Sequence, residues 1–575
     1  MANKTLSTVT QVTSVSSDDT LICEQSGSIK RVSVEGLTQV IADGMLAEVG
    51  IRTSDLMSYG VSWNTDVADP ILTRTGNMYY HKTRPIQDNM KGCIAQMKDG
   101  CKIMYYLNAT NWRWRADERG YVLTSKAITA SGSYFVLTDD VFTTNQYLYQ
   151  YIRINGIPCK VTAIDTSTGK ATISPESTLT AGTYDVTLGA CLNGYDGEVM
   201  VEVPEFWIKS WISGTYREVR VAPQKVDDTW EYQPRCLVGA YKDTLISTSP
   251  DADVWGYLNT LSLNSAVSIC NRSTFCRGGG NRSAYDTYFS SEPFRSDLQK
   301  PRTNISRANM RNYMRLSGKE ILNYLQYKRI IYWLYVIEYA NFNSQATFNA
   351  NLTSEGYRQG GLGEGPTNML RWDVYNVNYP VSQIGYTNTI TSGTDGVGGN
   401  GTGKRARTLN IPNSSTDATT TTLSYSNIRW HGIENPFGDI CTNLDGVIIK
   451  SYSTTIDGVH YGQVYATDNP SYYSDSDTSH MKIVGYEYNE HSGDYIKEYD
   501  LGTTAEIIPS VVGGSSVTYK CDTHYCSVKS QSSTLMIGGS AHNSSDAGLA
   551  YFYSTNAVSY SAGNLGFRSI YVINN

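Results

Sequence analysis

The sequence predicts an α+β fold that is mostly β, and three observations carry that prediction. Tyr (44) far outnumbers Phe (11), and Gly (50) far outnumbers Pro (16), which is typical of short strands with aromatic surface rather than of helices. Short segments of alternating apolar and polar residues, separated by turn residues, recur along the chain. Strong helix signals are confined to residues 306–345. At 575 residues the chain exceeds one ordinary core, so we expect about two to four units.

The N-terminal residues, 1–58, are predicted to form a small separate module. The segment SSDDTLICEQSGSIKRVSVEGL favours a strand, a Ser26-Gly27 turn, a second strand and then a short helix. That helix is too short to be stable alone, and its apolar stripe consists of Val34, Leu37, Ile41 and Leu46. Two arrangements fit the stripe: packing against copies of itself in an oligomer, or packing onto its own hairpin.

A large domain is predicted to follow and to be interrupted once. The interruption carries its own strand alternation and two hairpin turns, Asn155-Gly156 and Thr168-Gly169. We expect a small all-β domain inserted in a surface loop, where insertions cost little; a longer arm of the same sheet is the alternative. The expected boundaries are 59–120 for the first part of the large domain, 121–192 for the inserted domain and 193–575 for the remainder.

Two helices are predicted within the large domain. The shorter one spans residues from about Ser306 to Leu316. The longer one is opened by the capping-box pattern at Ser317 to Glu320, in which Ser317 would accept from the first free amides and Glu320 would reach back. Its second half is apolar on every side, so it must be covered all round. Upstream of both helices, residues 198–211 alternate strictly and predict one strand.

Charge and hydropathy argue against two kinds of partner. The formal net charge is −7 and no basic patch is evident, so nucleic acid is not an expected partner. The longest apolar run, Ile330 to Ile337, is too short to span a bilayer, so we expect no membrane insertion. No apolar signal segment follows Met1, which predicts synthesis in a cytoplasm. The eleven cysteines contain no CxxC pair and are expected to be mostly buried apolar residues.

The sequence offers no catalytic constellation, so we expect a non-enzymatic protein without cofactor or metal. Gly398, Gly403 and Lys404 fit the start of a phosphate-binding loop, but Arg405 stands where such a loop needs Ser or Thr, which favours a mobile surface loop. His81 has no acid or cysteine partner at a telling spacing, so a hydrogen-bonded structural histidine is expected.

Acidic residues leave two further kinds of site open. A glycosidase requires two carboxylates at a set separation, and distant residues such as Glu364, Asp373 and Asp445 could converge in space. A calcium site is a weaker interpretation, because the acidic turn lacks the glycine and distal glutamate of an EF-hand. That turn and its neighbourhood contain Asp475, Asp477 and Asp494.

The C-terminal stretch, Leu535 to Arg568, has the composition of a binding surface. Its two ends predict strands and its middle a displayed loop, with glycines at both borders. Serine, asparagine and tyrosine combine adaptable hydrogen bonding with aromatic contact area, although the same residues also fill ordinary solvated loops. The candidate ligand-binding residues, all expected to be exposed, are His542, Asn543, Ser545, Asp546, Tyr551, Tyr553 and Tyr560.

The order of motifs in this stretch resembles a known family. A GGS at Gly538, a polar block, a variable-looking tract and a GFR ending at Arg568 resemble the closing segment of the C-type-lectin-like domain in phage receptor-binding proteins. Retroelement-diversified tail tip proteins belong to that group, and the fold is shared with formylglycine-generating enzymes. Family members often have Trp after GGS, where this chain has Ala541. The resemblance implies a ligand-binding face between GGS and GFR.

Two further blocks of the large domain are similar to the same family. They are IEYANFNSQ followed by GGLGEG, and the block IRWHGIENPFGDICTNLDGVII, which starts at Ile428. In the second block Trp430, Ile433 and Phe437 are expected in the core, and Glu434 and Asn435 as buried hydrogen-bonding residues. The opening of the large domain resembles tail-fibre proteins of gut Bacteroidales phages, and the N-terminal hairpin loosely resembles phage attachment modules.

The resemblance implies a phage virion fibre or tail receptor-binding protein. Such a protein would be an adhesin that recognises a bacterial surface glycan or protein, attaches to other virion proteins through its N-terminus and forms a homotrimer. Two alternatives remain: a capsid (head) fibre or decoration protein, and a virion-associated glycan depolymerase.

Overall fold

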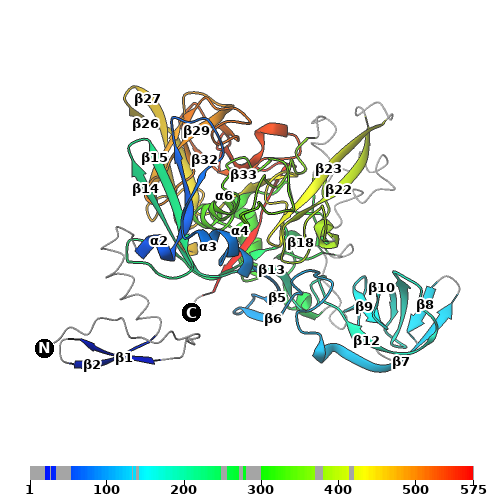
Figure 1. Cartoon of the computed structure of the whole chain (residues 1–575). Helices are drawn as coiled ribbons and strands as arrows, with labels where there is room; N and C mark the ends of the chain where they lie inside the picture. The colour runs from blue at the N-terminus through cyan, green and yellow to red at the C-terminus, as the bar shows by residue number, and fades with distance from the viewer. Residues whose placement is uncertain are drawn as a thin grey trace.

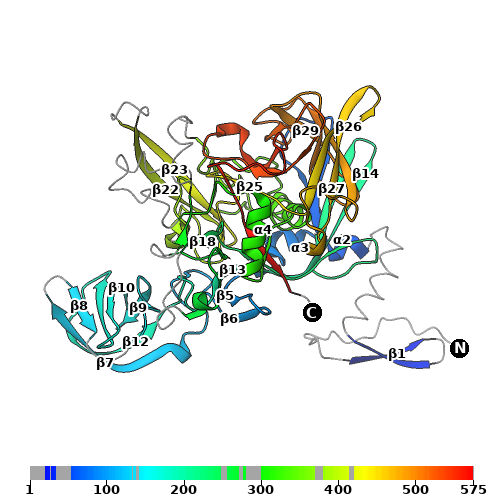
Figure 2. The same cartoon turned by 180° about the vertical axis from the view of Figure 1, so that it is seen from behind.

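The fold is described from a computed structural model of the chain (Figures 1 and 2). Strands account for 42% of the residues and helices for 13%, so the prediction of a mostly β, α+β protein is confirmed. Figure 1 places α4 (Arg307–Leu316) and α6 (Leu334–Tyr339) in the middle of the main body, and both views show a small barrel projecting from one side. The structure describes residues 20–25, 28–33, 53–131, 134–137, 142–247, 256–270, 276–279, 300–368, 380–390, 392–412 and 420–573.

Within the described residues, two large sheets organise the main body. The seven-stranded sheet has the order β30 (Ile508–Val512), β29 (Asp494–Asp500), β31 (Thr523–Tyr525), β34 (Gly548–Tyr553), β33 (Met536–Gly538), β25 (Cys441–Asn443) and β35 (Leu565–Gly566). The six-stranded sheet has the order β21 (Glu320–Ile321), β36 (Ser569–Val572), β17 (Cys236–Gly239), β13 (Glu198–Val203), β5 (Lys91–Gln96) and β6 (Lys102–Tyr106). The C-terminal stretch supplies β33, β34 and β35 to the seven-stranded sheet, and the residues directly after it form β36 of the six-stranded sheet.

Smaller described sheets surround these two. A five-stranded sheet contains β16 (Glu231–Gln233), β14 (Phe206–Ser213), β15 (Tyr216–Ala222), β3 (Tyr59–Asn64) and β4 (Thr73–Gly76). A four-stranded sheet contains β28 (Lys482–Tyr488), β27 (Val459–Ala466), β26 (Val447–Ile456) and β32 (Gln531–Ser533). Two three-stranded sheets contain β22 (Gly403–Pro412), β23 (Thr420–Trp430) and β24 (Ile433–Glu434), and β19 (Ala266–Val267), β18 (Thr244–Ile246) and β20 (Cys276–Arg277).

A buried helix runs through the middle of the body as three consecutive pieces: α5 (Tyr324–Tyr327), the π-helical segment η5 (Lys328–Trp333) and α6 (Leu334–Tyr339). All of its residues are buried, as the all-round apolar pattern predicted. Trp333 stacks on Trp63 of β3, with ring centroids 5.9 Å apart. The helix therefore ties the beginning of the large domain to its centre.

The predicted start of this helix is wrong. Its N-cap is Asn323, whose side chain accepts from the Gln326 amide at 2.9 Å. Ser317 is instead the C-cap of the preceding helix, and its hydroxyl donates to Ala266 and Met314 carbonyls. Glu320 lies in β21 and pairs with Arg315. Pairing with β36 keeps residues 320–321 extended, so tertiary contacts override the local capping pattern.

The shorter predicted helix is confirmed as α4 (Arg307–Leu316), with Ser306 as its N-cap. Two short helices were not predicted: α2 (Thr53–Met57) and α3 (Met78–Thr83). His81 of α3 is buried, and its ring nitrogens face Arg74 at 3.2 Å and the Thr75 carbonyl at 2.9 Å. Burial lowers the pKa of His81 to about 4, which is consistent with a structural histidine.

The single strand predicted over residues 198–211 is two strands in different sheets. β13 ends at Val203 and β14 begins at Phe206, with Pro204 between them. Every residue of β13 is buried, including Glu198, whose carboxylate forms an ion pair with the Lys319 ammonium at 2.5 Å. Lys319 also pairs with Asp243 at 2.7 Å. The other acid of β13, Glu202, pairs with Arg235, so the polar positions of this strand face charged partners rather than water.

A closed six-stranded barrel stands where the inserted domain was expected. Its order is β10 (Ile157–Asp165), β11 (Lys170–Pro175), β8 (Tyr134–Leu137), β7 (Val122–Ser131), β12 (Gly182–Leu188) and β9 (Tyr151–Ile154). Both predicted hairpins are present, and the barrel has a hydrophobic cluster of its own that includes Ile128, Ile152 and Val186. The chain enters and leaves side by side, because the Ala190 amide donates to the Arg113 carbonyl at 2.9 Å.

The N-terminal hairpin is present as β1 (Thr20–Gln25) paired with β2 (Ser28–Ser33). The Ser26-Gly27 turn and the predicted helix with Val34, Leu37, Ile41 and Leu46 lie outside the described residues. Ten cysteines have side chains that the structure describes; all ten are free and nine of them are buried, as predicted.

Only part of the glycine-rich run is the surface loop that was predicted: Gly393 to Asp395 and Val397 are exposed, whereas Gly398 and Gly399 are buried. Asn400 accepts from the Gly92 amide at 2.8 Å and from the Trp112 indole at 2.9 Å. The Gly399 carbonyl accepts from Arg429 at 2.7 Å, and Arg429 stacks on Trp112 at 3.8 Å. A Cβ at position 399 would lie 2.5 Å from the Ala109 carbonyl. The glycines therefore allow close packing between distant segments, a role that composition alone does not reveal.

The block that starts at Ile428 lies in the core, as predicted. Trp430, Ile433 and Phe437 are fully buried. The Glu434 carboxylate accepts from the Gly385 and Thr387 amides at 2.7 and 2.8 Å. The Asn435 side chain accepts from the Ile428 amide at 3.0 Å. These contacts confirm that the acid and the amide are structural hydrogen-bonding residues.

Candidate functional site

The C-terminal stretch forms part of a cavity of about 240 Å³ on one face of the seven-stranded sheet. Side chains alternate along β34, so Ala550 and Phe552 join the main core while Tyr551 and Tyr553 lie on the opposite face. Cys441 of β25 and Met536 of β33 complete the floor. The floor is therefore built on paired strands, which hold binding groups in place better than loops do.

Two loops form the walls of this cavity. Residues 540–543 supply Ser540, His542 and Asn543, and the segment between β34 and β35 supplies Asn556, Tyr560 and Asn564. The second loop is fastened at both ends: the Thr534 amide donates to the Asn556 carbonyl, and the Cys441 amide donates to the Asn564 carbonyl. Five of the seven predicted residues line this one cavity: His542, Asn543, Tyr551, Tyr553 and Tyr560.

Tyr551 departs most from the expected exposure; Asn543, Asp546 and Tyr553 are half-buried, and only His542, Ser545 and Tyr560 are exposed as expected. The Tyr551 side chain is buried, with 2% exposure, whereas Tyr560 is 37% exposed. Tyr551 packs in a cluster with Cys441, Met536 and Leu565, and alternation along β34 gives no signal for such partners from other strands. The Tyr551 hydroxyl remains at the cavity, where the Asn543 side chain lies 3.4 Å away. Burial raises the pKa of Tyr551 well above its ordinary value, so the phenol is neutral and can donate a hydrogen bond.

Ser545 and Asp546 do not line the cavity. They lie on the short helix η8 (Ser544–Asp546) and face two tyrosines from neighbouring strands. The Tyr495 and Tyr525 hydroxyls donate to the two oxygens of the Asp546 carboxylate at 2.8 and 3.0 Å. Ser545 lies 3.2 Å from the Tyr495 hydroxyl. The structure therefore divides the predicted set into a cavity group and an adjacent acidic group.

The loop that carries the cavity residues is held rigidly. Gly538 and Gly539 have φ of +85° and +67°, and a Cβ at Gly539 would lie 2.6 Å from the Ala547 side chain, so glycine is required there. The Asn543 side chain accepts from the Ser540 amide at 2.7 Å. Gln345 donates to the Ser544 carbonyl at 2.9 Å and also to Ala547. The cavity is thus preformed, as small-ligand sites usually are.

Sequence reasoning missed five lining residues: Cys441, Met536, Ser540, Asn556 and Asn564. Cys441 and Met536 look like ordinary core residues, and only the register of β25 with β33 brings them under the loop. Asn556 and Asn564 lie within the tract that the family resemblance marks as ligand-binding, so that resemblance was the available signal for them.

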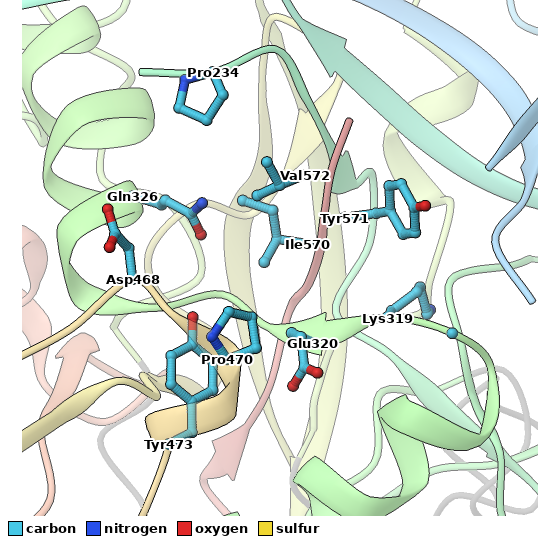
Figure 3. Close-up of a pocket in the computed structure, with 11 residues that line it drawn as sticks. Pro234, Lys319, Glu320, Gln326, Asp468, Pro470, Tyr473, Ile570, Tyr571 and Val572 are labelled. Carbon is cyan, nitrogen blue, oxygen red and sulfur yellow. The ribbon is translucent and has the colours of Figure 1, made fainter. Parts of the chain in front are cut away.

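A second cavity of about 350 Å³ lies beside β36 (Figure 3). Ile570 and Val572 point toward Gln326 and Asp468 across it, while Tyr571 points away. Three of its lining side chains form ion pairs with other residues: Glu320 with Arg315, Asp468 with Arg329, and Lys319 with Glu198 and Asp243. The residues that line the cavity beside β36 lie outside the stretch from Leu535 to Arg568 that the sequence marks as a binding surface.

Among the described residues, the predicted acidic candidates have other partners or lie apart. Asp445 is buried and pairs with Arg311, and Asp475 pairs with Arg307 and Arg311. Glu364 is exposed, and Asp373 lies outside the described residues. Asp477 accepts from the Ser479 amide at 2.8 Å within its own turn. Across the described residues, no cluster of three His, Cys, Asp or Glu side chains has the geometry to hold a metal ion.

Searches with protein-family models and among curated proteins find no match to this chain. Among the helices of the described residues, none is both long and apolar enough to cross a membrane.

Proposed function

We propose that this chain is a receptor-binding fibre protein of a phage virion, with a C-type-lectin-like domain that holds a bacterial surface ligand in the tyrosine-lined cavity. The observation that carries the proposal is the convergence of His542, Asn543, Tyr551, Tyr553 and Tyr560 on one preformed cavity. The segment that the family resemblance marks as ligand-binding is the segment that builds it.

The chemistry of the lining supports binding of a neutral polar ligand. Its aromatic faces offer contact area at low entropic cost, and its amide, hydroxyl and imidazole groups can both donate and accept hydrogen bonds. The described residues that line the cavity include no carboxylate, whereas glycoside hydrolysis usually requires a pair of them. The arrangement therefore favours an adhesin over the depolymerase alternative. A glycan or a polar peptide segment on the bacterial surface fits these groups.

The test is adsorption of the labelled full-length protein to a panel of gut Bacteroidales strains. Tyr560→Ala should abolish adsorption to the strains that bind the native protein, without changing the melting temperature. Val517→Ala is the matched control, because Val517 is an exposed apolar residue that does not line the cavity. Unchanged adsorption of Tyr560→Ala and of Tyr553→Ala would place the ligand elsewhere and refute the proposed site.

Two further measurements separate the alternatives. Incubation with purified capsular polysaccharide, followed by sizing of the product, should leave the chain length unchanged; shortening would establish a depolymerase. Gold labelling of intact virions should mark the tail, and labelling of the head would instead establish a capsid fibre or decoration protein.

The proposal includes attachment through the N-terminal module and assembly into a homotrimer. A module of under 60 residues that carries an apolar stripe buries little surface alone, and association supplies the missing burial. Light scattering of the full-length protein at micromolar concentration should report three chains. A monomer at that concentration would remove this part of the proposal.

A further inference from the structure

A second aromatic groove lies on the five-stranded sheet, far along the chain from the tyrosine-lined cavity. It has a volume of about 440 Å³ and is lined by Glu205, Trp207, Lys225, Asp228, Trp230 and Tyr232. Figures 1 and 2 both place β14, which carries Trp207, on the side of the body opposite the barrel. The groove belongs to a different sheet from the one under the tyrosine-lined cavity.

The floor of the groove is aromatic. Trp207 on β14 pairs with Tyr232 on β16, and their ring centroids lie 5.1 Å apart at an interplanar angle of 39°. The Trp230 ring is buried and packs edge-to-face against Trp211 at 5.5 Å. Tyr232 is 43% exposed, and Trp207 is half-buried. Two adjoining strands therefore present neighbouring aromatic rings to solvent from a fixed position.

Charged groups stand on both sides of these rings. Glu205 is exposed and accepts from the Tyr232 hydroxyl at 2.6 Å. On the other side, Lys225 and Asp228 form an exposed pair at 2.5 Å. The hydrogen bond to Glu205 raises the pKa of Tyr232 to about 12. The rim thus offers carboxylate acceptors and an ammonium donor around an aromatic floor.

We propose that this groove is a second carbohydrate-binding site, which takes a pyranose ring of a glycan. The apolar C–H face of the ring lies on Trp207 and Tyr232, since the negative face of an aromatic ring attracts such hydrogens. The equatorial hydroxyls donate to Glu205 and Asp228 and accept from Lys225. The groove volume falls in the range of small-ligand sites, about 300–1,000 Å³.

Other occupants fit these groups less well. A nucleotide would stack on the rings, but its phosphates would meet two carboxylates. A second copy of the chain, or an apolar peptide, would take the Glu205 carboxylate and the Lys225–Asp228 ion pair out of water, and desolvation of charged groups is costly even when they are paired. A sugar ring satisfies both the aromatic and the charged groups. This inference does not depend on the function proposed for the tyrosine-lined cavity.

The test begins with the full-length protein on an array of bacterial polysaccharides and of glucose, mannose, galactose and N-acetylglucosamine tetrasaccharides. A bound glycan is then studied by saturation-transfer NMR, in which the ring C–H protons should receive the strongest saturation. Trp207→Ala should weaken binding by about tenfold or more, the effect expected of a lost stacking partner. Glu205→Gln, which keeps the shape and removes the charge, should weaken binding severalfold.

Two control variants distinguish binding in this groove from binding elsewhere on the protein. Tyr216→Ala alters an equally aromatic residue, 60% exposed on the same sheet but outside the groove, and should leave binding unchanged. Tyr560→Ala probes the tyrosine-lined cavity, and a glycan signal lost there but retained in Trp207→Ala would overturn the proposal. The proposal would also be overturned if no glycan on the array gave a binding signal that Trp207→Ala abolishes. A fall in oligomeric state in Trp207→Ala would identify the groove as an interface between copies and would also refute it.

Discussion

Residues 540–564 and residues 565–570 are neighbours in one C-terminal stretch, yet they have opposite roles. The first segment supplies eight of the residues that line the tyrosine-lined cavity. The second segment is buried throughout, and Arg568 donates to the Gly239, Ala240 and Glu434 carbonyls at 2.6, 3.0 and 2.6 Å. The comparison teaches that a binding surface is held in place by an adjoining segment whose own hydrogen bonds are satisfied.

The largest effect is expected from Phe567→Ala. Phe567 is fully buried between α4 and the sheets, in a cluster with Met310, Met314 and Ile321. Truncation leaves a cavity and should reduce the free energy of unfolding by about 3–5 kcal/mol. Chemical denaturation of the full-length protein measures this loss. A change below about 1 kcal/mol would mean that the closing segment is not the rigid partner in the comparison.

We expect acid to destabilise the protein through the buried His81 rather than through the residues of the tyrosine-lined cavity. Burial lowers the pKa of His81 to about 4, below the ordinary value of about 6.5 for the unfolded chain. The unfolded state therefore binds the proton more readily, so stability falls as pH drops from about 6.5 toward 4, by roughly 3 kcal/mol in total from this group.

The measurement is the free energy of unfolding between pH 7 and pH 4 for two matched variants. His81→Gln should flatten the profile, while His542→Gln, at an exposed cavity position, should leave the native slope. The opposite pattern would locate acid sensitivity at the cavity and break the comparison.

A smaller effect on stability is expected from Tyr551→Phe, which sharpens the comparison inside the cavity. The ring stays in place, and only the hydroxyl near Asn543 is removed, so the free energy of unfolding should change by about 1 kcal/mol or less. Adsorption to bacterial cells should nevertheless weaken, because the hydroxyl lies at the cavity. Equal losses of stability and adsorption would indicate that Tyr551 acts only by packing.

The smallest effect on stability is expected at Tyr560. Its side chain is 37% exposed, so Tyr560→Ala should change the free energy of unfolding by less than about 0.5 kcal/mol. If Tyr560 is a hot spot, the same variant should lose roughly 2 kcal/mol or more of binding free energy. Parallel melting and adsorption measurements on one preparation decide this, and a destabilised variant would assign Tyr560 to the scaffold.

The sequence by itself determined the parts of this protein that depend on local pattern. The composition and the strand alternation led to a mostly β fold, and Asn155-Gly156 marked a hairpin because few other residues adopt its turn. The block around Trp430 was identified as core, and residues between GGS and GFR were identified as the candidate site. Five of the seven residues named there line one cavity.

Only the tertiary structure decided what depends on contacts between distant segments. Ser317 and Glu320 satisfy a local capping pattern, but pairing with β36 draws residues 320–321 into a sheet. The Gly399 segment was expected to be mobile, yet it packs against Arg429 and Trp112. Tyr551 was expected to be exposed, yet it packs in a buried cluster with Cys441 and Met536 from other strands. The reason is the same in each case: burial and pairing energies come from partners that are remote in sequence, and no local pattern records them.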